Sequence, residues 1–417
     1  MKKTIILAAA AALFLASCAK IEKNPATGAA TADNLAMDFG VYVPKVTKAG
    51  SAGEMNNAKL QSTGFGVIAY AKEGTYDGST KPTFMYNQLV EYSAPNWTYS
   101  PIKYWPNQLT DDGVTDGQSA VSKKAYTVSF FAYAPYVASA SGSEGIIAMS
   151  AASATGDPTI TYKVSDDLDK NVDLVWGTSD GNTWTNVAGG DNTAALGLPY
   201  LNLQKPAIGT KVNFKFYHAL AQLNISAQGA FNIAAAGGTA KDGVKVTIKE
   251  VALTVPGMRD QAVLNLNNTT AKIPKWDFTG ATATDLTLTV SGNKLHDNVK
   301  DAGAAEASTQ PAGVTNAEGP VLAANKYYTL LPTEDTAVTV TVKVTYYVTT
   351  DDTNLDDGYS RVENVIKKDI TFEHGFKAGT KNNIKMILGL SEVALSGDVA
   401  DWETGNTIEV YLPKNKE

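Results

Sequence analysis

Apolar residues recur at every second position in many short segments of this chain, and no long stretch has the 3.6-residue period of a helix. The clearest segment is Ala337–Thr350, in which valine and tyrosine side chains alternate with threonine and lysine. Alternation of this kind is typical of a half-buried β-strand. Glycine, asparagine, aspartate and proline separate such segments, so the pattern predicts an all-β fold of antiparallel β-sandwiches. Further strands are predicted at 37–43, 64–70, 126–133, 173–176, 211–218, 244–248, 286–290 and 408–412.

The position of the apolar residues within the alternation changes twice in the middle of the chain. The apolar face of 212–216 gives way to the opposite parity over 221–225, which predicts a β-bulge near His218. The parity shifts again between 244–248 and 251–255.

The chain has 417 residues and a formal net charge of -7, and only 18% of its residues are charged. A mildly acidic chain gives no reason to expect nucleic-acid binding. The length suggests about two domains. We place their boundary within Leu203–Gly209, where Gln204-Lys205-Pro206 interrupts the alternation. The expected domains are an N-terminal β-sandwich over 49–207 and a C-terminal β-sandwich over 208–417.

Residues 1–17 have the features of a secretory signal peptide. Two lysines are followed by an apolar stretch from Ile5 to Leu15, which is too short for a bilayer span of about 20 residues. The run Leu15-Ala16-Ser17-Cys18 resembles the lipobox of bacterial lipoproteins. That resemblance implies cleavage before Cys18 and a lipid on its sulfur, which would anchor the protein in an envelope membrane. The alternative is an ordinary signal peptide with an incidental cysteine. Residues 18–48 are then a lipid tether followed by a first strand.

The motifs that could indicate catalysis or metal binding do not have the required context. Gly177–Gly181 matches G-x-S-x-G, but turn and strand residues follow instead of a helix, which predicts a tight loop. The histidines His218, His296 and His374 lack metal-ligand spacing. Asp351–Gly358 is acidic but lacks the closing glutamate of a calcium loop, which favours a hairpin tip. We therefore expect no catalytic residue, no metal and no cofactor, and we do not expect an enzyme.

Several segments, in this order along the chain, resemble the fimbrillins of Bacteroidales, which are the pilins of type V fimbriae and include FimA-like and Mfa-like lipoproteins. They follow the lipobox and a phenylalanine-containing strand, and cover nearly the whole chain. The segments are Thr47–Gly50 (TKAG), Tyr99–Pro106 (YSPIKYWP), Val128–Tyr136 (VSFFAYAPY), Asn213–Ile225 (NFKFYHALAQLNI), Gly379–Leu388 and Asp401-Trp402.

The resemblance implies two transthyretin-like β-sandwiches in tandem, export as an outer-membrane lipoprotein, and polymerisation with other fimbrial subunits at the cell surface. It also implies a trypsin-like protease that removes the N-terminal strand, after which a strand of a neighbouring subunit fills the vacated groove. The protease of the best-studied members cuts after arginine. Here Lys48 stands at that place, and the two arginines, Arg259 and Arg361, lie far from the N-terminus.

The residues themselves favour the same mechanism. A strand with Met37, Phe39, Val41 and Val43 on one face is followed at once by a basic loop of small residues. Removing such a strand would expose unpaired backbone and an apolar groove, and strand addition would refill both. The alternative is a permanent edge strand with surface lysines after it.

Cleavage after Lys48 is favoured over Lys45 because a β-branched valine follows Lys45. For the donor strand we propose residues 407–413, whose apolar residues are also spaced two apart. They are Ile408, Val410 and Leu412.

Two further functions remain open beside that of a structural pilin. One is a tip or accessory fimbrial adhesin, whose adhesive target the sequence does not identify. The other is a surface glycan-binding lipoprotein, for which Trp97, Trp105, Trp176 and Trp184 are candidate contacts. Asp335-Thr336-Ala337 resembles the O-glycosylation signal of Bacteroidetes, with Thr336 as the acceptor.

Overall fold

The structure is a computed structural model, in which the regular secondary structure of the described residues is β-strand apart from one short helix, α1 (Asn57–Thr63). Seven residues are far too few to cross a membrane, and none of the described helices is long and apolar enough to do so. The all-β fold class is therefore confirmed. The structure describes residues 35–42, 54–106, 126–229, 244–281, 283–291, 318–322, 326–333, 335–388, 393–401 and 405–408.

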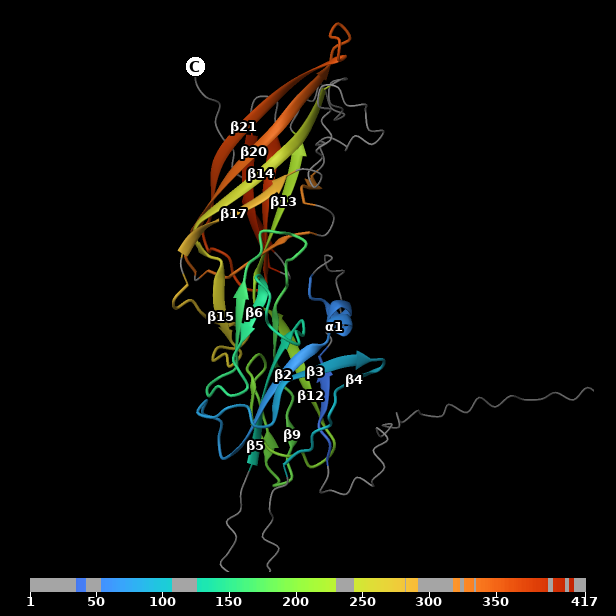
Figure 1. Ribbon diagram of the computed structural model, residues 1–417, viewed down its shortest axis with the longest axis vertical. Helices are drawn as coiled ribbons and strands as arrows, with labels where there is room; N and C mark the ends of the chain where they lie inside the picture. The colour runs from blue at the N-terminus through green and yellow to red at the C-terminus, as the bar shows by residue number, and fades with distance from the viewer. Residues whose placement is uncertain are drawn as a thin grey trace, which may run out of the picture.

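The first sheet lies in the lower half of the molecule in Figure 1, with α1 beside it. Its strand order is β1-β12-β8-β5-β2-β3-β4, and β11 pairs with β5. β5 is buried along nearly its whole length because both faces of this sheet are covered. The strands are β1 (Asp38–Val41), β2 (Phe65–Glu73), β3 (Met85–Ser93), β4 (Asn96–Thr98), β5 (Tyr126–Ala134), β8 (Val175–Ser179), β11 (Tyr200–Leu203) and β12 (Lys211–His218).

Two sheets form the upper half of the molecule (Figure 1). One has the order β17-β14-β20-β21, from β14 (Val244–Arg259), β17 (Ala283–Ser291), β20 (Val338–Asp351) and β21 (Tyr359–Phe372). The other has the order β18-β13-β22-β23-β24, with β19 paired to β13. Its strands are β13 (Ala221–Gly229), β18 (Gly319–Pro320), β19 (Tyr328–Leu330), β22 (Thr380–Leu388), β23 (Val393–Asp401) and β24 (Gly405–Ile408). Among the paired strands, only β1–β12 and β13–β22 run parallel in the described part of the chain.

A fourth sheet joins strands from both halves of the sequence in the order β16-β15-β7-β6. The strands are β6 (Gly145–Met149), β7 (Thr159–Lys163), β15 (Gln261–Asn265) and β16 (Lys275–Asp277). β15 follows β14 after a single residue, Asp260, and pairs antiparallel with β7. A short hairpin of β9 (Trp184–Thr185) and β10 (Asp191–Asn192) completes the described strands.

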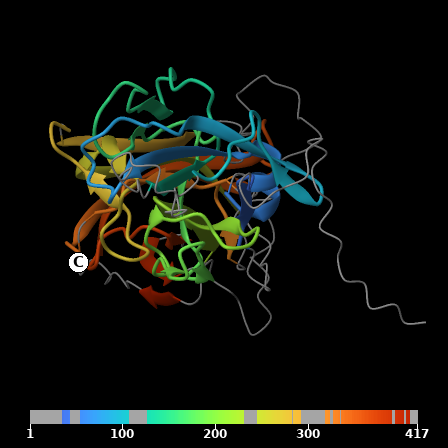
Figure 2. The same ribbon diagram turned by 90° about the horizontal axis from the view of Figure 1, so that it is seen from below.

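Hydrogen bonds fasten the β15–β16 region to the earlier part of the chain. The side chains of Asn265 and Asn267 each donate to Asp157 at 3.0 Å. Asn268, which is 2% exposed, donates to the Gly197 carbonyl at 2.9 Å. One continuous apolar core accordingly runs from the first sheet, through this shared sheet, to the upper sheets, and strands from distant parts of the sequence lie around it (Figure 2).

The parity change near His218 marks a change of sheet and not the bulge that the sequence suggested. β12 pairs with β8 up to His218, and β13 begins at Ala221 in another sheet. The division into two domains stays a proposal, and this strand order favours a boundary just after His218 rather than at 207. The second parity change does coincide with an irregularity of β14, between Ile248 and Glu250.

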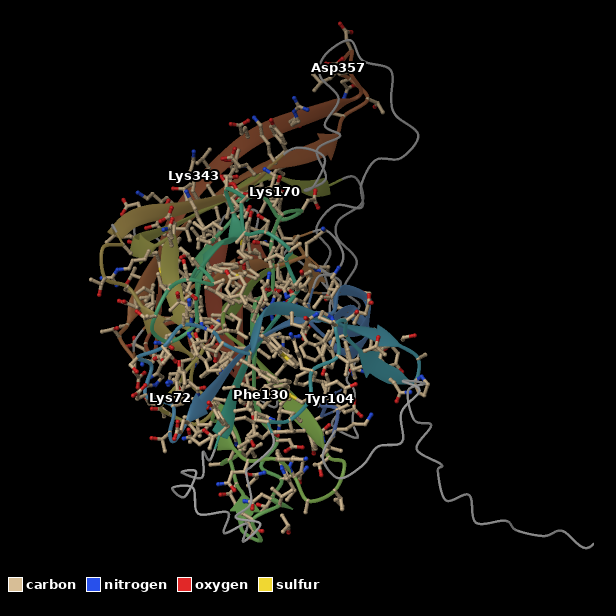
Figure 3. The ribbon with its side chains drawn as sticks, turned by 60° about the horizontal axis from the view of Figure 1, so that its bottom comes forward. Lys72, Tyr104, Phe130, Lys170, Lys343 and Asp357 are labelled. Atoms are coloured by element: carbon tan, nitrogen blue, oxygen red, sulfur yellow. The ribbon has the colours of Figure 1, made fainter. Side chains whose placement is uncertain are left out.

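Two loops have the plain structural roles that their sequences indicated. In the G-x-S-x-G segment, Ser179 is buried at the end of β8 and accepts a hydrogen bond from the Gly181 amide at 2.9 Å. Gly181 has φ +82°, a conformation that favours glycine. The acidic segment is the tip of the β20–β21 hairpin, where the Asp352 amide donates to the Gly358 carbonyl, and Asp357 lies at this tip in Figure 3.

Candidate assembly groove

β1 lies at the end of the first sheet and has hydrogen-bonding partners on both sides. On one side it runs parallel to β12, with Phe39 opposite Val212 and Val41 opposite Phe214. Beyond the end of β1, the Tyr42 amide donates to the Phe214 carbonyl at 2.9 Å.

The other side of β1 faces the segment that follows β4. The Met37 amide donates to the Lys103 carbonyl at 2.9 Å, and the Trp105 amide donates to the Leu35 carbonyl at 3.0 Å. An antiparallel bridge pairs Ala36 with Tyr104. β1 also lies against β4, the strand at the opposite end of the sheet order. β1 therefore closes a curved sheet by joining the two edges of that sheet. It lies in a groove whose walls are residues 103–105 on one side and β12 on the other.

An aromatic pocket in this groove holds the side chain of Phe39, which is 0% exposed. The centre of its ring lies 5.1 Å from the ring centre of Tyr99, 5.9 Å from that of Phe130 and 6.1 Å from that of Phe214. Phe130 comes from β5 and lies within the first sheet (Figure 3). Met37 is also buried, and Val41 is half-buried. Burial of each large apolar side chain is worth about 1.5–3 kcal/mol.

The Tyr99 hydroxyl contacts the main chain of the strand in the groove. It donates to the Met37 carbonyl at 3.1 Å and accepts from the Lys103 amide at 3.2 Å. Burial raises the pKa of Tyr99 to about 12, so the hydroxyl keeps its proton at neutral pH. Because the bond goes to a carbonyl, Tyr99 holds an occupant of the groove regardless of its sequence.

The outer rim of the groove is basic. Lys211 lies 3.2 Å from Asp38, with both side chains nearly half exposed, so this ion pair contributes little stability. Lys215 lies 5.1 Å from the ring centre of Tyr42 and 5.5 Å from that of Tyr217, which is cation–π geometry. The rim thus accommodates an acidic and an aromatic side chain of the strand.

The chain that follows the proposed cleavage segment is held at a separate anchor. The Met55 amide donates to Asp173 at 2.8 Å, and Asp173 pairs with His218 at 2.9 Å. Glu54, 6% exposed, pairs with Lys381 at 3.3 Å. These contacts are independent of β1, so the chain from residue 54 onward has its own attachment to the fold.

Of the predicted site residues, Met37, Phe39 and Val41 lie together in the groove. Ile408 does not lie there, because β24 pairs with β23 in the upper half, with Ile408 opposite Gly397. The remaining predicted residues lie outside the described ones: Cys18, Val43, Lys45, Lys48, Val410 and Leu412.

Thr336, the proposed glycosylation acceptor, is exposed just before β20. The neighbouring Asp335 lies 3.2 Å from His374 and 3.4 Å from Lys377, and the hydrogen bond with His374 holds the pKa of Asp335 below its usual range. Across the described residues, no group of three or more acidic, histidine or cysteine side chains is arranged to hold a metal.

The tryptophans considered for glycan binding belong to the interior. Trp105 and Trp176 are 2% and 1% exposed, and Trp97 and Trp184 are half-buried against the groove core. Sequence reasoning missed Tyr99 and residues 103–105 as the second wall of the groove. That segment pairs through its backbone over only a few residues, so it leaves no alternation to detect.

Residues 122–402 match the family model described as fimbrillin-like. The chain belongs to the fimbrillin-like family. It is also 30% identical to the fimbrium subunit Fim1C of Phocaeicola vulgatus over 185 residues, which are 42% of this chain and 42% of Fim1C. The match thus spans about two fifths of that relative's length.

The fold is similar to the crystal structure of a fimbrial protein from Bacteroides vulgatus ATCC 8482. The TM-score is 0.62 at 20% sequence identity, over 88% of this chain and all of that one. At that identity the similarity establishes the fold alone.

Proposed function

We propose that this protein is a structural subunit of a surface fimbria that polymerises by strand exchange at the β1 groove. The observation that carries the proposal is that β1 bridges two sheet edges and fills an aromatic pocket, although it is short and lies at the end of the sheet order. A strand placed in this way can leave while the rest of the sheet keeps its other pairings. Membership of the fimbrillin-like family and the similarity to Fim1C support the fimbrial role.

The proposed sequence of events begins with export as a lipoprotein anchored to the outer membrane through Cys18. A trypsin-like protease then cuts after Lys48, or alternatively after Lys45, and β1 departs with the tether. Contacts at Glu54 and Met55 keep the new N-terminal region attached.

In the last step, residues 407–413 of another subunit enter the groove. The first of these residues belong to β24, which pairs with β23 at only four positions, so donation requires the release of a short ladder. A donor-to-groove contact joins two different surfaces of the subunit, and repetition builds an open filament.

The test is to treat the purified protein with trypsin and look for filaments by negative-stain electron microscopy and for ladders on SDS gels. Three forms are compared: the wild-type chain, Lys45→Ala/Lys48→Ala, and a deletion of 407–417. We expect polymers only from the wild type. Polymers of equal length and number from both variants would rule out assembly through these segments.

A tip or accessory adhesin with the same fold is the second candidate. It would accept a donor strand without extending the filament in both directions, so it would form capped dimers in the same assay. A glycan-binding role has less support, because the four candidate tryptophans lie in or against the core.

A further inference from the structure

The C-terminal residues repeat the end of the first strand. Val41-Tyr42-Val43-Pro44-Lys45 and Val410-Tyr411-Leu412-Pro413-Lys414 differ at one position, where leucine replaces valine. The two segments are also similar in polarity before this repeat. An apolar residue stands two places before the first valine in each, Phe39 before Val41 and Ile408 before Val410. The two segments lie at opposite ends of the sequence, so no local element of structure requires this identity.

We propose that residues 407–413 of a second copy of this chain occupy the groove in the direction and register of β1, residue for residue. Ile408 then replaces Phe39, Val410 replaces Val41, and Tyr411 replaces Tyr42. This assignment rests on the proposed function and adds what that function leaves open, namely which way the donor runs and which residue enters which pocket.

The contacts of Tyr42 account for the tyrosine that the two segments share. The Tyr42 amide donates to the Phe214 carbonyl, and its ring lies against Lys215. Tyr411 repeats both interactions when the donor runs parallel to β12. Two residues later each segment has a proline, which lacks an amide hydrogen and cannot extend a ladder. We therefore expect pairing with β12 to end at the same position for both strands.

The position of Gly40 requires one local adjustment. Glu409 takes the place of Gly40, where an added Cβ would meet the side-chain oxygen of Asn213. This atom is the end of a flexible, half-buried side chain, which can rotate away. The same Cβ lies 3.7 Å from the Lys211 Cδ, so the carboxylate of Glu409 comes beside the lysine that pairs with Asp38 in the intact chain.

The aromatic pocket explains why the donor does not displace β1 before cleavage. Ile408 is smaller than the phenylalanine that the three surrounding rings enclose, so it fills the pocket less completely. β1 also belongs to the same chain as the groove, so its effective concentration at the groove is higher than that of a strand from a second molecule. Cleavage removes that advantage, and once β1 has dissociated the groove is open to the donor.

Disulfide trapping between copies tests the register. Glu409→Cys with Asn213→Cys, and Thr407→Cys with Lys211→Cys, place cysteines at positions that correspond to the observed pairs Gly40–Asn213 and Asp38–Lys211. The matched control is Glu409→Cys with Lys215→Cys. It displaces one cysteine by two residues, to about 8 Å from its partner given the strand spacing and rise, which is too far for a disulfide. Cys18, the one native cysteine, leaves with the cleaved segment.

After trypsin treatment and oxidation, we expect covalent ladders from the first two variants and none from the control. A ladder from the control would mean a register shifted by two. A ladder from one of the first two alone would mean an antiparallel donor, because only a parallel strand satisfies both pairs. Filaments without any ladder would mean a different donor. Each of these results overturns the assignment, whereas the absence of filaments from the wild-type chain would overturn the proposed function itself.

A synthetic peptide of residues 405–415 provides a second measurement that does not depend on filament growth. We expect it to bind the trypsin-treated protein. Tyr411→Ala in the peptide should weaken binding about two- to fivefold, the range for loss of an exposed cation–π contact. Tyr411→Phe keeps the ring and should bind like the original peptide. Equal binding by the alanine peptide would refute the placement of Tyr411 against Lys215.

Discussion

Replacing Phe39 by alanine tests how much β1 contributes to the intact fold. The side chain is 0% exposed and contacts the rings of Tyr99, Phe130 and Phe214. Truncation of a phenylalanine in such a site costs about 3–5 kcal/mol of unfolding free energy. Three aromatic contacts, each worth about 0.5–1.5 kcal/mol beyond area burial, place Phe39→Ala toward the upper end of that range.

The assay is urea unfolding of the uncleaved protein, followed by tyrosine and tryptophan fluorescence, with Tyr42→Ala as the control. Tyr42 is 45% exposed, and its contact with Lys215 is worth about 0.5–1 kcal/mol. We expect the midpoint to fall sharply for Phe39→Ala and slightly for Tyr42→Ala.

The same comparison after trypsin treatment distinguishes a removable strand from a fixed one. If β1 leaves, Phe39 leaves with it, so wild type and Phe39→Ala should unfold identically. A difference that persists after cleavage would show that β1 stays in its groove. A change below about 0.5 kcal/mol in the uncleaved protein, the size typical of surface substitutions, would refute the pocket as described.

Three further predictions concern the anchor, the shared sheet and the buried tyrosines. Cys18→Ala should abolish incorporation of radiolabelled palmitate, and normal incorporation would refute lipidation at Cys18. Asn268→Ala should lower the unfolding free energy by about 1–3 kcal/mol, because it leaves the buried Trp176 indole without its hydrogen-bond acceptor and removes one of the two bonds that the Gly197 carbonyl accepts, the other coming from the Lys272 amide. Asn354→Ala, at the exposed hairpin tip, is the control in calorimetry and should change little. Burial raises the pKa of Tyr70 and of Tyr99 to about 12 from an ordinary 10.0, so the stability that these groups contribute is complete below pH 10 and is lost as the pH rises toward 12. An unfolding free energy that stays constant from pH 10 to pH 12, measured by urea unfolding, would contradict this.

The strands were predictable wherever their two faces differ in environment. β20 has one face in the core and one toward solvent, so its valines alternate with polar residues. Alternation reports which side of a strand is buried, but not the sheet to which the strand belongs. For this reason the alternation predicts a bulge at His218, although the chain there leaves one sheet for another. The β15–β7 pairing was not predictable either, because it joins segments about a hundred residues apart.

The candidate groove was partly predictable for a similar reason. The inward residues of β1 are apolar and spaced by two, so the occupant of the groove was recognisable. The second wall of the groove, residues 103–105, contacts β1 through backbone groups, which are the same for every sequence. Of the residues on that side, only Tyr99 adds a side-chain hydrogen bond. The repeat of Val41–Lys45 at Val410–Lys414 is present in the sequence alone. Comparing the chain with itself over five residues, and not only for its apolar period, would have found it.

β12 connects the groove to the point where the chain continues after the proposed cut. Its first half, Lys211 to Phe214, pairs with β1. Its last residue, His218, contacts Asp173, which holds the Met55 amide. β12 pairs with β8 on its other side, through hydrogen bonds that do not involve β1. Loss of β1 therefore empties one edge of β12 and leaves the anchor of residue 55 in place. A groove with a fixed floor needs no refolding to accept a donor, because its hydrogen-bonding edge and its aromatic pocket are already formed.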